Sequence, residues 1–232
     1  MVHVIARHRP GTQARGEDTR RRILETALEI FATEGYEGAS TRQLAERADV
    51  NLPAIQYYFG SKEGLFRAVL EDIIEHTERH MAPLDMRVKA ALADPGTSRE
   101  KLLELLCEML KAFVALVLGG TQIESRRLLF ARSEVEDTPG LEQLHESGRR
   151  HVFAPCLSLI ARLIGRPADD PETSMRALAV IGQVTIFCHK GALDAGEAAE
   201  FTPDRLQLIQ DLVREHTIAI FRAVSSKAAP LQ

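Results

Sequence analysis

Apolar residues recur at helical spacing along almost the whole chain, and this periodicity limits the fold more than any other feature. Positions 23, 24, 27, 28 and 31 are all apolar, and these offsets place them on one face of a helix. No run of β-branched residues alternates with polar ones between turn residues, so we expect no β-sheet. The sequence therefore predicts an all-α fold.

The composition excludes several classes of protein. Of 232 residues, 45% are hydrophobic and 27% are charged, which is ordinary for a globular chain and argues against disorder. The longest uncharged apolar stretches, residues 112–120 and 177–188, are shorter than the ~20 residues of a membrane span, and no secretory signal begins the chain. Three cysteines without a CxxC pair predict neither a disulfide framework nor a zinc finger. We expect a cytoplasmic protein with no membrane partner and no cofactor.

Basic residues are concentrated at the start of the chain. Residues 1–22 contain six arginines and two acidic residues, whereas the whole chain has a net charge of −4. A basic segment on an acidic body indicates local contact with a polyanion, although a tail that only aids solubility has the same composition. Pro10, Gly11 and Gly16 lie among polar residues, so residues 1–16 are predicted to form a flexible arm before a helix that starts near Glu17.

Capping residues predict a short helix, a tight turn and a second short helix. Ser40 begins a capping-box pattern in which the Gln43 side chain reaches back to the start of the helix. Asn51 follows the turn and is a good N-cap, and Pro53 is tolerated in a first helical turn because its missing N–H has no partner there. The second short helix is therefore expected at residues 52–58.

Three helices with a tight turn between the second and third are typical of a helix-turn-helix. Apolar positions 44, 45, 48, 50 and 55 would pack the two short helices together and leave polar and small side chains outside. Such an outer face suits the major groove of DNA, where Asn and Gln read adenine and Arg reads guanine. A plain helical hairpin in an α-bundle is the alternative. The outward residues are Arg42, Asn51, Leu52, Ala54, Gln56 and Tyr57.

Residues 22–62 resemble the N-terminal domain of the TetR family of transcriptional regulators. The matching residues are Ile23, Leu24, Ala27, Phe31, Gly35, Tyr36, Ser40, Thr41, Leu44, Ala45, Ala48, Val50, Tyr58, Phe59, Ser61, Lys62, Glu63 and Leu65. Residues 50–63, and more loosely 126–132 and 177–187, are similar to the CecR-like branch of the family. Two departures from the common pattern are Asp49, where the family usually has Gly, and Gln56, where Tyr is common.

The resemblance implies a DNA-binding role for each matching position. Thr41, Tyr58 and Lys62 would hold phosphates, and Arg42, Gln56 and Tyr57 would reach base edges or neighbouring phosphates. Leu52, Pro53 and Ala54 would make close apolar contacts beside Asn51. In the arm, Arg7, Arg9 and Arg15 either add contacts to the DNA or belong to a tail with no specific role.

The rest of the chain predicts a larger helical body, which in the resembling family binds a small molecule and dimerises. Helices are expected at residues 84–93, 98–118, 122–135, 141–164 with a kink at Pro155, 172–190 and 203–224. The predicted domains are the arm 1–16, the helix-turn-helix domain 17–62, a connecting helix 63–80, the ligand-binding and dimerisation domain 81–225, and a tail 226–232.

The last two helices are apolar on several faces, which favours a two-fold four-helix interface between two copies, although burial in a monomer remains open. The interface residues are predicted to be Met175, Leu178, Ile181, Leu208, Leu212 and Ile220. The small-molecule effector is expected to bind among apolar and a few polar side chains of the central helices, although each of these side chains could instead serve ordinary core packing or a surface ion pair. Its predicted contacts are Met109, Phe113, Glu124, Arg127, Phe130, Phe153, Gln183 and Phe187.

Other classes of function have less support in the sequence. His76 and His80 have an i, i+4 spacing that can bind a metal, but no further ligands are evident and no metal site is predicted. No GxSxG, GxxxxGK[ST] or strand-associated GxGxxG motif supports an enzyme, so no catalytic residues are predicted. A helical ligand carrier without DNA binding is a further alternative. We therefore expect a homodimeric repressor that leaves a near-palindromic operator when an effector binds.

Overall fold

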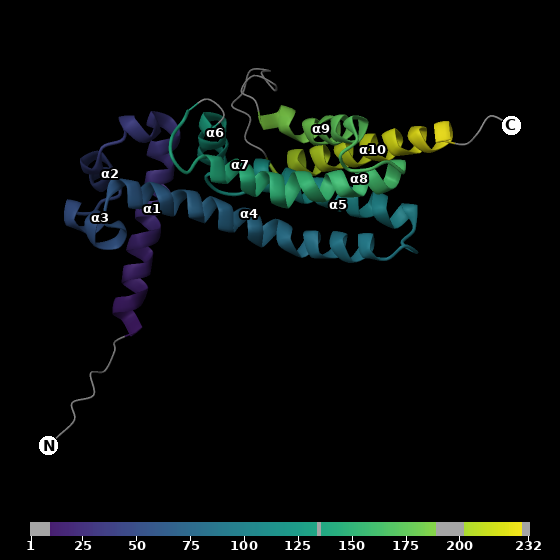
Figure 1. Cartoon of the computed structure of the whole chain (residues 1–232). Coiled ribbons are helices and arrows are strands. Elements are labelled where there is room, and N and C mark those ends of the chain that lie inside the picture. Colours follow the sequence, from purple (N-terminus) through teal and green to yellow (C-terminus); the bar gives the residue numbers. More distant parts are fainter. Residues whose placement is uncertain (1–9, 134–135, 189–201, 229–232) are drawn as a thin grey trace. The chain divides into compact units, whose positions relative to one another are not determined.

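The computed structural model describes residues 10–133, 136–188 and 202–228, and every regular element in these ranges is a helix (Figure 1). The all-α prediction is confirmed. The α-helices are α1 (Pro10–Gly38), α2 (Thr41–Arg47), α3 (Leu52–Phe59), α4 (Lys62–Ala93), α5 (Arg99–Leu118), α6 (Ile123–Ser133), α7 (Glu142–Gly148), α8 (Ala154–Ile164), α9 (Pro171–Thr185) and α10 (Pro203–Ala228). A π-helical turn (Arg149–Phe153) and a 3₁₀ turn (Ile186–Cys188) complete the set. No helix of the described ranges is long and apolar enough to cross a membrane.

The chain divides into two compact units. The first contains the described parts of Met1–Asp72 and Glu124–Gly140, and the second those of Ile73–Ile123 and Leu141–Gln232. Helix α4 is continuous from one unit into the other. The first unit includes α6, whereas the predicted boundaries placed all of residues 81–225 in the body.

The second unit is built around α5, which packs against α8, α9 and α10. Leu106, Met109 and Ile160 are completely buried in its core. Arg99, in the first turn of α5, donates hydrogen bonds to the carbonyl of Leu163 on α8 and, at 2.9 Å, to that of Phe221 on α10. One guanidinium thus joins three helices, and the Leu163 carbonyl that it binds lies in the last turn of α8, where carbonyls have no intrahelical partner.

Two predicted helix boundaries are wrong. Helix α1 begins at Pro10, so residues 10–16 are helical and do not belong to a flexible arm. Helix α4 continues through Pro83, where we had expected a new helix at residues 84–93. Pro83 is exposed, and the buried side chains of Met81 and Val88 on either side of it anchor the helix to the core, which offsets the loss of one backbone hydrogen bond.

Pro155 changes the helix that precedes it, as predicted, although the change is a widened turn. Because Pro155 has no N–H for the carbonyl of His151, the regular hydrogen-bond ladder cannot continue there. The Ala154 N–H instead bonds to the Arg149 carbonyl five residues earlier, which forms the π turn between α7 and α8.

Candidate DNA-binding surface

Helix α2 begins as its capping signal predicts, with one difference. The Ser40 hydroxyl accepts a hydrogen bond from the Gln43 backbone N–H at 3.2 Å, so Ser40 is the N-cap. The Gln43 side chain does not reach back to the start of the helix. Its amide nitrogen donates to the Glu34 carboxylate at 2.6 Å and links α2 to α1. The second half of the predicted capping box is therefore wrong.

The turn between α2 and α3 depends on Asp49, which has a φ of 51°. Few residues other than Gly adopt this left-handed conformation, and Asp tolerates it better than most. The Arg22 guanidinium on α1 donates to the Asp49 carbonyl at 3.3 Å, and the Val50 N–H donates to the Ala45 carbonyl at 3.0 Å. These contacts fix the direction in which α3 leaves the turn.

Helix α3 has one buried residue and three partly buried ones, Ala54, Tyr58 and Phe59, and its other four side chains are exposed. The Asn51 side chain caps the helix by accepting from the Ala54 N–H at 3.0 Å, and Pro53 occupies the first turn. Ile55 is buried against the first unit. Leu52 is 50% exposed and Tyr57 is 82% exposed, which is unusual for large apolar and aromatic side chains. The helix therefore presents a free face to a partner.

The ten predicted DNA-contacting residues all retain access to solvent. Arg42, Asn51, Leu52, Pro53, Gln56 and Tyr57 are exposed, and Thr41, Ala54, Tyr58 and Lys62 are partly exposed. Some already have partners within the first unit. Arg42 pairs with Glu46 at 2.9 Å, and this hydrogen bond raises the pKa of Arg42 above its ordinary value. Lys62 lies over the ring of Tyr36, 4.5 Å from its centre, and the Tyr57 and Tyr58 rings meet edge to face at 5.0 Å.

The basic residues at the start of α1 have more specific roles than the sequence suggested. Arg22 holds the Asp49 carbonyl, and Arg20 lies over the Phe59 ring at 5.3 Å. Arg21 pairs with Asp18 at 3.1 Å. Arg15 lies on helix α1, whereas the predicted contacts at Arg7 and Arg9 fall outside the described residues. The sequence contained no local signal for the partners of Arg20 and Arg22, because those partners lie on other helices.

A second arginine contact that the sequence analysis missed stabilises the end of α1. Gly35 has a φ of 75°, which interrupts the helical hydrogen bonding of α1. Arg132 on α6 donates to the carbonyls of Ala32 at 2.7 Å and Thr33 at 2.6 Å, and it pairs with Glu136. A side chain from α6 thus caps α1 and packs α6 onto the helix-turn-helix unit.

The predicted effector-binding residues are divided between the two units. Glu124, Arg127 and Phe130 lie on α6 in the first unit. In the second unit, Met109 is completely buried in the core. Phe113, Phe153 and Phe187 are partly buried and pack against this core. Gln183 is also partly buried, and its Oε1 lacks a hydrogen-bond partner within the described residues.

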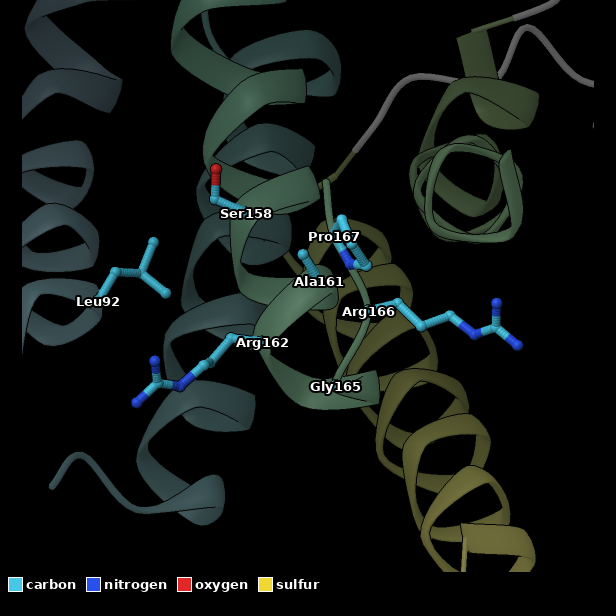
Figure 2. Close-up of a pocket in the computed structure, with 7 residues that line it drawn as sticks. All are labelled: Leu92, Ser158, Ala161, Arg162, Gly165, Arg166 and Pro167. Carbon is cyan, nitrogen blue, oxygen red and sulfur yellow. The ribbon is translucent and has the colours of Figure 1, made fainter. Parts of the chain in front are cut away.

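Two surface hollows formed by described residues of the second unit have other linings. The larger, of about 480 Å³, is formed by Leu92, Ser158, Ala161, Arg162, Gly165, Arg166 and Pro167 (Figure 2). The smaller, of about 340 Å³, lies between α4, α5 and α10. Neither contains a residue predicted to bind the effector, so that set stays a prediction.

Most of the predicted dimer residues are exposed, as an interface requires of a single subunit. On α9, Met175 and Leu178 are 69% and 61% exposed, and on α10 Leu208 is 57% exposed. Leu212 and Ile220 also reach solvent, whereas Ile181 is partly buried. Exposed large apolar side chains thus lie on α9 and α10, two helices that contact each other.

The described residues contain no group of three His, Cys, Asp or Glu side chains placed to hold a metal ion. His76 and His80 stack with ring centres 4.1 Å apart, and the His80 Nδ1 lies 2.7 Å from the His76 carbonyl. The pair is therefore accounted for by contacts within α4.

Two family models match the chain in sequence order. Residues 23–69 match the model of bacterial regulatory proteins of the tetR family. Residues 102–224, more than half of the chain, match the C-terminal domain of the HTH-type transcriptional dual regulator CecR. The chain belongs to the TetR family and is CecR-like. The proteins of this family that the chain matches are transcriptional regulators and not enzymes.

Relatives agree with this assignment over different lengths. The dual regulator CecR of Shigella flexneri is 25% identical over 222 residues, which cover 94% of this chain and 98% of that protein. The repressor NicS of Pseudomonas putida is 35% identical over 97 residues, covering 41% and 44% of the two chains. A TetR-like regulator from Rhodococcus sp. RHA1 has the same fold, with a TM-score of 0.58, 19% identity and coverage of 86% and 93%. A regulator named AibR, solved with isovaleryl coenzyme A and operator DNA, has a TM-score of 0.58, 17% identity and coverage of 85% and 97%.

Proposed function

We propose that this TetR-family regulator is a repressor that binds a near-palindromic operator and leaves it when a small molecule binds the C-terminal domain. The observation that carries the proposal is the structure of α3. Ile55 anchors one side of the helix, Asn51 caps its start, and Gln56 and Tyr57 face solvent on the other side. A short helix held in this way can enter the major groove and present an amide to an adenine edge.

We propose that residues on both sides of α3 bind phosphates of the DNA backbone. Thr41 at the start of α2 and Lys62 at the start of α4 lie next to the first helical turns, whose free N–H groups favour an anion. Tyr58 would donate its hydroxyl to a phosphate at the end of α3. Phosphate contacts would position the protein on DNA, and the exposed side chains of α3 would determine its sequence specificity.

Two copies are required for a near-palindromic operator. We propose that the apolar side chains of α9 and α10 form the dimer interface, because they are exposed on two adjacent helices. A two-fold dimer would set the recognition helices about 34–36 Å apart, or at a multiple of this distance, so that each reads one half-site.

For the response to an effector, we propose that α4 carries the signal. It is one continuous helix from Lys62 to Ala93 and contributes residues to both units. A change in its tilt would alter the spacing of the recognition helices. The effector can release DNA only to the extent that it prefers the state that does not fit the operator. The fold similarity to AibR, which was solved with isovaleryl coenzyme A and operator DNA, supports a protein that binds an effector as well as DNA.

The proposal is tested by measuring binding to the DNA upstream of the protein's own gene, by gel shift at several salt concentrations. Lys62→Ala is expected to weaken binding to every DNA sequence. It should also lower the slope of log affinity against log salt by about 0.9, the value of one phosphate contact. Gln56→Ala is expected to change the preferred operator instead. Glu142→Ala, an exposed residue on α7, is the matched control and is expected to change neither. Binding that is unaffected by both test variants would refute the roles assigned to Lys62 and Gln56, and an unaltered protein that binds no DNA would favour a helical ligand carrier.

A further inference from the structure

The first turns of α1 extend beyond the part of the helix that the hydrophobic core holds. Ile23 is the first buried residue of the chain's described part, whereas α1 already begins at Pro10. In Figure 1 this segment continues past α3 toward the N-terminus. Residues 14–22 include no buried side chain, so packing on the core contributes little stability to this part of the helix and other contacts must account for its position.

Two contacts hold this extension beside the C-terminal end of the recognition helix. A Cβ atom placed on Gly16 would lie 3.6 Å from the Tyr58 hydroxyl, so the Gly16 backbone passes near the Tyr58 side chain with room for about one carbon atom between them. One turn later, the Arg20 guanidinium lies 5.3 Å over the Phe59 ring. Gly16 and Arg20 are four residues apart and share one face of α1, which is therefore the face that follows α3.

The positive charges of the extension lie toward the helix-turn-helix. Arg22 reaches the Asp49 carbonyl directly before α3, and Arg15 stands seven residues earlier, on the same stripe of the helix. Among the described residues, the Arg15 side chain makes no ion pair. The acidic Asp18 is neutralised by Arg21 at 3.1 Å, and Arg21 also approaches Glu25 at 4.0 Å. Arg15, Arg20 and Arg22 thus have no acidic partner among the described residues, and Arg22 alone of the three donates a hydrogen bond that fixes it, to the Asp49 carbonyl.

We infer that this segment of α1 is a second DNA-contacting element, in which Arg15 and Arg20 bind phosphates next to the one held by Tyr58. The inference rests on the proposed function. A guanidinium that lies over an aromatic ring keeps the N–H groups at its edge available, and these donate well to phosphate oxygens. Because the contacts are to the backbone, they add affinity for all DNA sequences and do not change the choice of operator.

The test compares the salt dependence of DNA binding for the full-length protein and its variants. Each lost phosphate contact lowers the slope of log affinity against log salt by about 0.9. Arg15→Ala and Arg20→Ala are each expected to remove one contact from both operator and unrelated duplexes, and the double variant to remove two. Arg21→Ala is the matched control, since its charge is already paired with Asp18 on the same helix. An unchanged slope in the double variant would overturn the inference.

Two further variants separate other causes of weak binding. Arg20→Lys keeps the charge and is expected to retain the slope. Arg20→Met keeps a long apolar side chain on Phe59 without the charge and is expected to lose one contact, whereas a purely structural role for the Arg20–Phe59 contact predicts that Arg20→Met binds like the unaltered protein. Circular dichroism of each variant identifies unfolding, and Arg15→Ala tests the segment without touching Phe59. If the unaltered protein binds no DNA, the proposed function fails. If it binds, with a preference that depends on Gln56, and the arginine variants bind equally well, only this inference fails.

Discussion

The contact between Arg132 and the end of α1 leads to a measurable prediction for Arg132→Ala. Gly35 has a φ of 75°, so the N–H groups that follow it do not point back to Ala32 and Thr33 in a regular helix. The carbonyls of these two residues instead accept from Arg132 at 2.7 and 2.6 Å. Hydrogen bonds to a charged donor contribute about 1.5–3 kcal/mol each, and the lower end applies where water can replace the donor.

Water can reach Thr33, which is exposed, but not Ala32, which is completely buried. We therefore expect Arg132→Ala to lower the free energy of unfolding of the first unit by about 2–3 kcal/mol, with most of the loss at the Ala32 carbonyl. Arg132→Lys keeps the charge but cannot serve two carbonyls with one planar group, so it is expected to recover only part of the loss.

Urea denaturation of the full-length protein measures the overall change, and hydrogen exchange localises it to the end of α1 and to α6. Arg150→Ala is the matched control, because the Arg150 side chain is 61% exposed and its ion pair within the described part of the chain is with the Glu146 carboxylate, at 3.4 Å. The control is expected to change stability by less than about 0.5 kcal/mol. Equal urea midpoints and equal exchange rates for Arg132→Ala and Arg150→Ala would show that the cap does not stabilise α1.

Two other properties of the body can be measured directly. Leu178→Glu places a charge in the proposed interface and is expected to convert a dimer into a monomer in sedimentation experiments. The control Met86→Glu, at a side chain on α4 that is 66% exposed, should leave the dimer intact. Equal effects of the two substitutions would place the interface elsewhere. Burial raises the pKa of the Cys156 thiol to about 12 and that of Cys107 to about 11, from an ordinary value near 9. Both thiols should resist iodoacetamide at pH 8 until the protein unfolds, as followed by mass spectrometry, and rapid labelling of the native protein would contradict this. Since the unfolded chain loses these protons near pH 9 and the folded chain does not, stability should be unaffected below pH 8 and should fall as the pH rises from 9 toward 11.

The features that the sequence predicted correctly depend on neighbouring residues. Ser40 and Asn51 cap their helices through N–H groups three residues away, so a short pattern contains the whole interaction. The spacing of Ile55 among exposed residues predicted which side of α3 is buried. The same local rules misplaced the start of α1, because Pro10 and Gly11 suggested a loop while Pro is in fact well suited to the first turn of a helix.

The contacts that fix the turn before α3 and the end of α1 could not be predicted in this way. Arg22 and Asp49 are 27 positions apart, and Arg132 lies 100 positions from Ala32, so neither pair leaves a periodic trace in the sequence. In both cases an arginine donates to a carbonyl where regular helical hydrogen bonding stops. Arg22 binds the carbonyl of Asp49, which has a positive φ, and Arg132 binds carbonyls in the turn before Gly35, which also has a positive φ. A residue with positive φ releases carbonyls from helical hydrogen bonding, and a guanidinium can bind them from a distant helix. A left-handed residue where a helix or turn ends therefore indicates where a long-range arginine contact should be sought, even though the sequence does not identify which arginine makes it.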